Sequence, residues 1–380
     1  MRKALKNFFL ISVPFFFISF IVAELILRIW FPVPDPYKDL MIGKNEILPL
    51  YIPSQYEPFS CFKFESHEHL PGLDSSMIFT TNNYGFRGDT IKVPKPFNEF
   101  RIFIIGRSTA ECLYLDDSKS LNKLLQDELQ KKNKISVIKV YNAGISGNLS
   151  SDHIAILSQR ITHLEPDLII LFAGINDFMR STDDYDYLHM SADSKIKNGH
   201  ISTLICIKYI ATFSQISRRI YYALVSQNKR SVIESLPLLT NVREKRKCFL
   251  SLPYTEKKLP ELNLKPFRIN LNSIVGICKA NKIHLIFMTN QSTWNSKVDS
   301  CIEDYHWHCF FHGLRYKEEY MEAGLDSFNN VMREIAVSSD VPIYDLARII
   351  PKSTHYFFDD CHFNKHGAYY TAVGLAHFIV

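Results

Sequence analysis

The sequence predicts an α/β protein built around a central parallel sheet with helices on both faces. Three observations lead to this fold class. From residue 99 onward, short apolar runs alternate with longer amphipathic segments, in the order strand, helix, strand, helix. The apolar runs are continuous, as in strands that are buried on both faces. The chain has 380 residues, which leaves room for one large domain with additional segments.

The strands are predicted from short apolar runs that end at a glycine or a polar turn. The first run, RIFII, is rich in β-branched residues and ends at Gly106. The third run is wholly apolar and follows the turn pair Pro166-Asp167. In chain order we predict strands over Arg101–Ile105, Ile135–Tyr141, Leu168–Ala173, Ile283–Thr289 and Val341–Leu346.

The helices are predicted from the segments between these strands. The first places Leu121, Leu125 and Leu129 on one face, which is the spacing of an amphipathic helix. In chain order we predict helices over Ser120–Lys132, Ser151–Leu164, Phe267–Asn281, Met321–Val337 and Gly367–Val380.

The first 31 residues have the composition of a membrane anchor. Residues 1–7 are rich in lysine and arginine, and Phe8–Phe31 is almost wholly apolar, broken by Glu24 and Arg28. At ~1.5 Å per residue, the apolar stretch spans roughly 36 Å, enough to cross a bilayer. We predict a transmembrane helix over 8–31, with residues 1–7 in the cytoplasm and the rest outside. A cleaved signal peptide is the alternative. Glu24 is costly in lipid, so it would need the outer interface or a partner.

Beyond the anchor, the sequence divides into an extension and a main domain. A proline-rich stretch that begins at Pro32 predicts a stiff spacer, and we interpret residues 32–97 as a linker and an N-terminal extension. The main domain is predicted over 98–380, with an insertion at about 181–266. Within the insertion, Ile205–Val225 predicts an amphipathic helix, which is either a lid over the site or a plain packing helix.

Composition excludes several classes of function. Hydrophobic residues make up 46% and charged residues 22% of the chain, an ordinary globular mixture. A net charge of +5 is too mild to indicate nucleic-acid binding. Eight cysteines do not make a disulfide scaffold at this length.

Polar residues with catalytic potential follow the predicted strands. Ser108 follows the first strand, the glycine-containing turn 142–148 follows the second, and Asn176 follows the third. Asp359 and His362 lie between the last strand and the last helix. Taken singly, each has a plain structural explanation, such as a helix cap, a turn or an exposed histidine.

Their shared location favours a common function. The carboxyl ends of parallel strands meet at one edge of the sheet, where ligands bind in such folds. There Ser108 can act as a nucleophile and His362 as its base, while Asp359, three residues before the histidine, can orient the imidazole. A glycine N–H at Gly147 and the amide of Asn176 can donate to a developing oxyanion. The set predicts acyl transfer by a serine nucleophile, which needs no cofactor and no metal.

In these four blocks the sequence resembles the SGNH hydrolase superfamily, the GDSL esterases and lipases. Ser108 matches the nucleophile, Gly147 and Asn176 match the other oxyanion-hole residues beside the Ser108 N–H, and Asp359 with His362 matches the Asp-x-x-His block. The resemblance implies a flavodoxin-like three-layer α/β/α sandwich and a carboxylic ester as substrate.

Two further features refine the resemblance. A segment with the sequence TNNYGFRG, over Thr81–Gly88, and the anchor are similar to the membrane-anchored bacterial branch. The resemblance therefore implies a domain in the cell envelope that acts on a small acyl ester, a carbohydrate O-acyl group or a lipid ester. Arg107 departs from the family, which has a small or acidic residue before the serine, and a large cation there could alter substrate access.

Other functions stay open at this point. An O-acyltransferase that acts on cell-envelope glycans would use the same triad, and a non-catalytic envelope binding domain would not need it. A metal-dependent hydrolase built on Asp359, His362 and His366 is a weaker alternative. If His362 is the base, we expect activity to fall as it protonates, at about pH 6–7 from the ordinary pKa of histidine.

Cys301 and Cys309 lie in a segment that also contains three histidines, His306, His308 and His312. A local disulfide and a zinc cluster are both possible in an oxidising compartment. We favour two unpaired surface cysteines in an insertion.

Overall fold

The computed structural model describes residues 9, 12–32, 56, 58–65, 70–133, 135–181, 214–220, 242–295, 300–311 and 313–380. The chain divides into two units. One consists of Met1–Leu50 and Asp186–Leu236, and the other of Tyr51–Tyr185 and Pro237–Val380. Most of the predicted linker and most of the predicted helix Ile205–Val225 lie outside the described residues.

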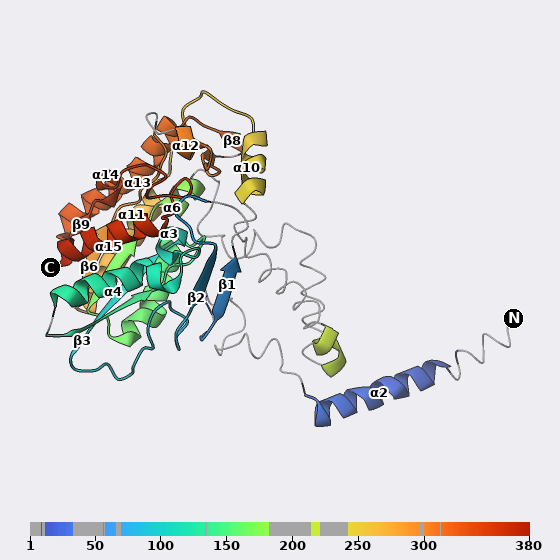
Figure 1. Ribbon diagram of the computed structural model, residues 1–380. Helices are drawn as coiled ribbons and strands as arrows, with labels where there is room; N and C mark the ends of the chain where they lie inside the picture. The colour runs from blue at the N-terminus through green and yellow to red at the C-terminus, as the bar shows by residue number, and fades with distance from the viewer. Residues whose placement is uncertain are drawn as a thin grey trace. The chain divides into compact units, whose positions relative to one another are not determined.

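The larger unit is built on a five-stranded parallel sheet (Figure 1). Its strand order is β4-β3-β5-β6-β9, the 2-1-3-4-5 order of flavodoxin-like folds. The strands are β3 (Glu99–Gly106), β4 (Val137–Asn142), β5 (Leu168–Phe172), β6 (His284–Met288) and β9 (Ile343–Tyr344). The predicted fold class is confirmed.

Helices cover both faces of this sheet. Along β3, Ile102 and Ile104 point into one buried cluster, and Phe103 and Ile105 point into the other. This alternation is the period of a strand with two buried faces. The first cluster includes residues of α4 (Leu121–Lys132) and α15 (Lys365–Ile379); the second includes residues of α5 (Ser150–Ile156), α11 (Lys265–Ala280) and α13 (Glu318–Ser339).

The order of the strands determines where a binding crevice can form. The chain leaves β3 toward β4 on one side and later returns to pair β5 on the other side of β3. This is a topological switch point, and the loops beyond the carboxyl ends of the strands form a crevice there.

Smaller elements lie around the sheet. An antiparallel hairpin joins β1 (Cys61–Glu65) to β2 (Ser76–Thr80) within the predicted extension. A π-helical turn and a 3-10 turn, Leu157–Ile161 and Thr162–Leu164, continue α5. The remaining elements are α3 (Ser108–Glu111), a 3-10 turn (Asp117–Lys119), α6 (Ile175–Arg180), α10 (Val242–Ser251), α12 (Ser300–Glu303), β7 (Phe310–Phe311), β8 (Leu314–Arg315) and α14 (Leu346–Ile349).

The smaller unit contains the apolar helix α2 (Val13–Trp30). With a mean hydropathy of 2.0 and no buried residue, this helix is long and apolar enough to cross a membrane.

Glu24, the residue of this helix that is costly in lipid, has hydrogen-bond partners within the same unit. Its carboxylate accepts hydrogen bonds from the backbone N–H groups of Gln215 (2.7 Å) and Ile216 (3.1 Å) and from the Ser214 hydroxyl (3.0 Å). Residues 215–220 are helical, so Glu24 caps the start of that segment.

Candidate active site

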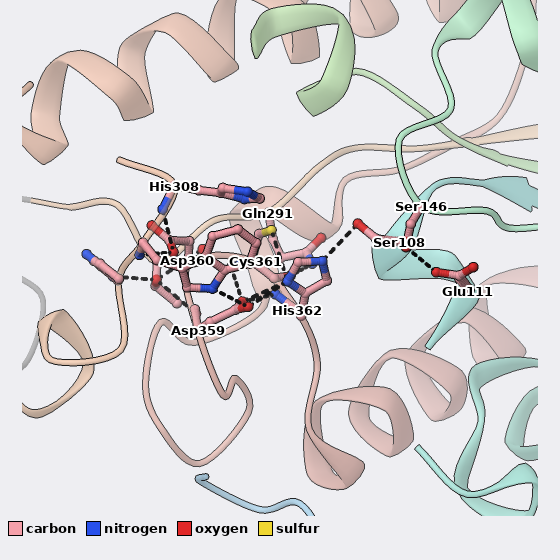
Figure 2. A network of polar contacts seen from close by, with 12 residues as sticks. Ser108, Glu111, Ser146, Gln291, His308, Asp359, Asp360, Cys361 and His362 are labelled. Carbon is pink, nitrogen blue, oxygen red and sulfur yellow. Dashed lines mark hydrogen bonds and ion pairs between the residues drawn. The ribbon is translucent and has the colours of Figure 1, made fainter. Parts of the chain in front are cut away.

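The structure brings Ser108, His362 and Asp359 together in one chain of hydrogen bonds (Figure 2). The Ser108 Oγ lies 2.8 Å from His362 Nε2, and His362 Nδ1 lies 2.7 Å from the Oδ2 of Asp359. With the Nδ1 proton donated to the carboxylate, Nε2 is free to accept the serine proton. This arrangement suits a serine activated as a nucleophile.

Local backbone structure explains how these residues meet. Ser108 begins the short helix α3 directly after β3, at the carboxyl edge of the sheet. In the loop before α15, Asp359 Oδ1 accepts hydrogen bonds from the N–H groups of Cys361 (3.0 Å) and His362 (2.8 Å). The carboxylate therefore closes the tight turn that places the imidazole beside it. Asn364 then caps α15 by accepting from two backbone N–H groups of its first turn.

The electrostatics of the pair follow from burial and charge. Asp359 is 1% exposed, and the side chain of His362 is 14% exposed. Burial alone would lower the pKa of His362, but the adjacent carboxylate outweighs it and holds this pKa well above its ordinary value. Burial likewise opposes ionisation of Asp359, yet the imidazolium and the donated hydrogen bonds hold its pKa below the ordinary value. The expected loss of activity on acidification therefore moves upward from the pH 6–7 estimated from sequence.

Gly147 and Asn176 lie on the loops that follow β4 and β5. Gly147 has a φ of +85° and is exposed, and no atom would lie within 4 Å of a Cβ at this position. The residue thus needs glycine for its backbone conformation, with open space beside it. Asn176 is half-buried, and its Nδ2 donates to the carbonyl of Asn148 (2.9 Å). This bond ties the Asn176 amide to the loop that carries Gly147.

Asp177 reinforces that tie from the next position. Its carboxylate accepts from the backbone N–H of Ser150 (3.1 Å) and from the Ser150 hydroxyl. Burial raises the pKa of Asp177 to about 6. Asn176 and Asp177, which are consecutive in α6, therefore bind the end of the Gly147 loop and the start of α5, respectively.

Several predicted features have different surroundings from those expected. Arg107 does not project into the substrate space: it is 2% exposed, and its guanidinium donates to Asn290 Oδ1 (2.9 and 3.1 Å).

The residues of the alternative metal site do not all lie together. His366 is apart from the candidate site and stacks on His355, with ring centroids 4.7 Å apart. Asp359, Cys361 and His362 form a group whose potential ligand atoms lie within 4.8 Å of one another. This group excludes His366, and its carboxylate and imidazole are already hydrogen-bonded to each other.

Neither cysteine of the 301–309 segment forms a disulfide within the described part of the chain. Cys301 is exposed, but Cys309 is fully buried, and its Sγ lies 3.6 Å from the carbonyl of Tyr316. The interpretation of both as surface residues is therefore wrong for Cys309.

The TNNYGFRG segment supports the nucleophile helix. Arg87 is 3% exposed, and its guanidinium donates to the carbonyls of Glu111 (3.1 Å), Cys112 (2.8 Å) and Leu115 (2.5 Å). It also forms an ion pair with Asp117 (2.8 Å). Because α3 is only four residues long, its terminal carbonyls need such a donor. Arg87 thus fixes the helix that begins at Ser108.

Sequence reasoning missed Glu111, which lies three residues after Ser108. Its carboxylate is 1% exposed and accepts a hydrogen bond from the Tyr56 hydroxyl (2.6 Å). It also accepts one from the Ser146 hydroxyl (Figure 2). Burial raises its pKa above the ordinary value. Glu111 therefore joins the nucleophile helix to the loop of Gly147. A lone acidic residue in a short helix gave no sequence signal for this role.

Sequence reasoning also missed Asp360 and Trp307. The Asp360 side chain is fully buried and accepts from the backbone N–H of Trp307 (2.6 Å) and that of His308 (3.0 Å). The segment around Cys301 and Cys309, interpreted from sequence as an insertion, therefore lies against the loop of the candidate base.

One protein family and several solved structures are similar to this chain. The model of the GDSL-like lipase/acylhydrolase family matches residues 104–369. No curated protein sequence matches the chain significantly. Similar solved structures include an acetyl xylan esterase, AlAXEase (12% identity, 74% of this chain and 100% of that chain, TM-score 0.41). Others are the acetylxylan esterase Axe2 from Geobacillus stearothermophilus (16%, 74% and 94%, 0.40) and a lipase/acylhydrolase from Enterococcus faecalis (14%, 74% and 95%, 0.39).

The matched range spans most of the parallel sheet and the loops that carry Ser108, Gly147, Asn176, Asp359 and His362. We conclude that this chain belongs to the GDSL-like lipase/acylhydrolase family and is an ester hydrolase.

Proposed function

We propose that the protein cleaves a carboxylic ester with Ser108 as nucleophile, His362 as general base and acid, and Asp359 as the residue that orients the histidine. One observation carries this proposal. The Ser108 Oγ and the Asp359 carboxylate lie at hydrogen-bonding distance from opposite nitrogens of the same imidazole, at 2.8 and 2.7 Å. This is the geometry by which an imidazole takes a serine proton while its positive charge is stabilised.

The reaction then follows in two halves. Ser108 Oγ attacks the ester carbonyl as His362 Nε2 takes the hydroxyl proton, which gives a tetrahedral oxyanion. The oxyanion collapses, the bond to the alcohol oxygen breaks, and His362 returns the proton to the leaving alcohol. Water attacks the acyl-serine with His362 again as base, and the acid and the free serine are released.

The oxyanion would be stabilised by three donors, the N–H groups of Ser108 and Gly147 and the side-chain amide of Asn176. The positive φ of Gly147 and the open space beside it leave its backbone accessible. The bond from Asn176 to the Asn148 carbonyl uses one proton of the amide, and its second proton is available to a ligand. Glu111 and Asp177 support this group by holding the loop from both sides.

We further propose that the protein belongs to the membrane-anchored bacterial branch of the superfamily. The α2 helix would span the membrane with residues 1–7 in the cytoplasm, where their basic side chains favour retention. The domain over 98–380 would then face outward, on a linker and extension over 32–97. Its substrate would be a small acyl ester, a carbohydrate O-acyl group or a lipid ester of the cell envelope.

Covalent labelling by a fluorophosphonate probe tests the proposed nucleophile. The full chain in detergent micelles would be compared with Ser108→Ala and with Ser118→Ala, which removes an exposed serine ten residues away. We expect labelling of the wild type and of Ser118→Ala, and none of Ser108→Ala. A folded wild-type protein that does not label, or a Ser108→Ala variant that labels equally, would refute the proposed nucleophile.

A further inference from the structure

We propose that Trp307 is a positioning residue of the catalytic site, which acts through Asp359 and is held in place by Asp360. This inference rests on the proposed triad. The indole Nε1–H of Trp307 donates to Asp359 Oδ2 at 3.1 Å. The same carboxylate oxygen lies 2.7 Å from His362 Nδ1. The indole and imidazole rings are nearly parallel, with an interplanar angle of 7° and centroids 6.4 Å apart.

The backbone around Trp307 is fixed by the neighbour of the triad carboxylate. Asp360 Oδ2 accepts from the backbone N–H of Trp307 at 2.6 Å. It also accepts from the backbone N–H of His308 at 3.0 Å (Figure 2). Asp360 Oδ1 accepts from Trp294 Nε1 at 2.7 Å. Two consecutive carboxylates therefore face different partners: Asp359 holds the histidine, and Asp360 holds the segment that supplies the indole. Any movement of this segment would be transmitted to the triad loop, because both acidic residues share one backbone.

The environment of Asp359 makes a fixed indole donor useful. The carboxylate is buried, and a buried carboxylate needs hydrogen-bond donors from the protein in place of water. Its Oδ1 is oriented by the N–H groups of Cys361 and His362. The indole provides a donor to Oδ2, so rotation of the carboxylate away from the imidazole would break bonds at both oxygens. Trp307 thus helps to keep Oδ2 directed at Nδ1.

The same hydrogen bond also tunes the base. A donor to Oδ2 withdraws negative charge from the oxygen that stabilises the imidazolium. Without the indole proton, the carboxylate would hold the imidazolium more strongly, and the pKa of His362 would rise further. Since the reaction needs the neutral imidazole, the acid limb of the pH profile would move to higher pH. A residue that only fills space would not move this limb.

The test uses the full chain in detergent and the pH dependence of the rate constant for fluorophosphonate labelling. Trp307→Phe keeps an aromatic ring and removes the N–H, while Tyr305→Phe is a matched control on the same segment. We expect Trp307→Phe to raise the inflection of the acid limb by about 0.5–1 pH unit. We also expect the plateau rate to fall roughly 10-fold through loss of orientation. Tyr305→Phe should keep the wild-type profile.

Three outcomes would overturn the inference. They are an unchanged inflection in Trp307→Phe, a shift to lower pH, and an equal shift in Tyr305→Phe. Circular dichroism of each variant shows whether the protein is folded, and rates are compared only among folded variants. Failure of the proposed function looks different, because the wild type would then show no Ser108-dependent labelling at any pH.

Discussion

Replacement of Arg87 by alanine should destabilise the protein strongly, although the hydrogen bonds of its guanidinium go to Asp117 and to main-chain carbonyls and not to the proposed triad. The buried guanidinium supplies the hydrogen bonds of three main-chain carbonyls just after Ser108 and pairs with Asp117. Each buried carbonyl left without a donor costs at least about 1 kcal/mol. The Asp117 carboxylate is 34% exposed, so its pair adds less than about 1 kcal/mol.

These contributions amount to about 3–5 kcal/mol, the range found when one partner of a buried charged network is removed. A domain is stabilised by only about 5–15 kcal/mol in total. Arg87→Ala should therefore lower the free energy of unfolding by a large fraction. It should also slow fluorophosphonate labelling. The carbonyls that lose their donor lie at the C-terminal end of α3, the helix that begins with Ser108, so the position of the nucleophile would be less well fixed.

Urea unfolding of the full chain, followed by tryptophan fluorescence, measures this change. Arg268→Ala is the matched control, since Arg268 pairs with Glu334 on the surface, with side chains 43% and 58% exposed. We expect this control to change stability by less than about 1 kcal/mol. A loss of stability in Arg87→Ala no larger than in the control would refute the argument that Arg87 supports the nucleophile helix.

Two further predictions concern the proposed chemistry. The Asp359 carboxylate holds the pKa of His362 well above its ordinary value, and only the neutral imidazole accepts the serine proton. The rate of labelling should therefore rise with pH, with its inflection above about pH 6.5; an inflection below pH 6 would contradict the assigned base. Asn176→Ala should lower turnover of an ester substrate such as p-nitrophenyl acetate by ~10²–10³ without unfolding the protein. Asn330→Ala on the exposed face of α13 is the control, and a turnover of Asn176→Ala equal to wild type removes Asn176 from the oxyanion hole.

Most of the fold could be predicted because each strand is a separate apolar run followed by a turn. The last strand was predicted too long, as Val341–Leu346 instead of β9 over Ile343–Tyr344. It lies at the edge of the sheet and pairs with β6 at two positions only, so the apolar run in the sequence is longer than the part that pairs as a strand.

One predicted helix also differs in kind. The segment Ser151–Leu164 begins as α5 but continues as a π-helical turn and a 3-10 turn. The Ser158 hydroxyl donates to the carbonyl of Ile154 (2.8 Å) within this region. Side-chain bonds of this kind to the preceding turn bend helices, and hydrophobic periodicity does not reveal them.

The candidate site likewise has residues that could be predicted from sequence and residues that could not. Ser108, Asn176, Asp359 and His362 could be proposed from sequence because each stands in a short motif at the end of a strand or before a helix. Their supporting residues could not. Tyr56 lies 55 residues before its partner Glu111, and Trp307 lies 52 residues before its partner Asp359. Contacts between loops so far apart follow no period, and only the fold brings them together.

The bonds of Glu24 mean that two distant parts of the gene are interdependent. The carboxylate in α2 satisfies donors at positions 214–216, about 190 residues later. Loss of the acid would remove the acceptor that these donors share, whereas loss of the donors would leave the carboxylate with its ion pair to Arg28 at 2.8 Å as its remaining polar contact in this helix. The helix cannot therefore be exchanged freely for another apolar sequence. Because the donors at 215 and 216 are backbone N–H groups, we expect position 214, whose hydroxyl is the side-chain donor of this group, to change together with position 24 among relatives.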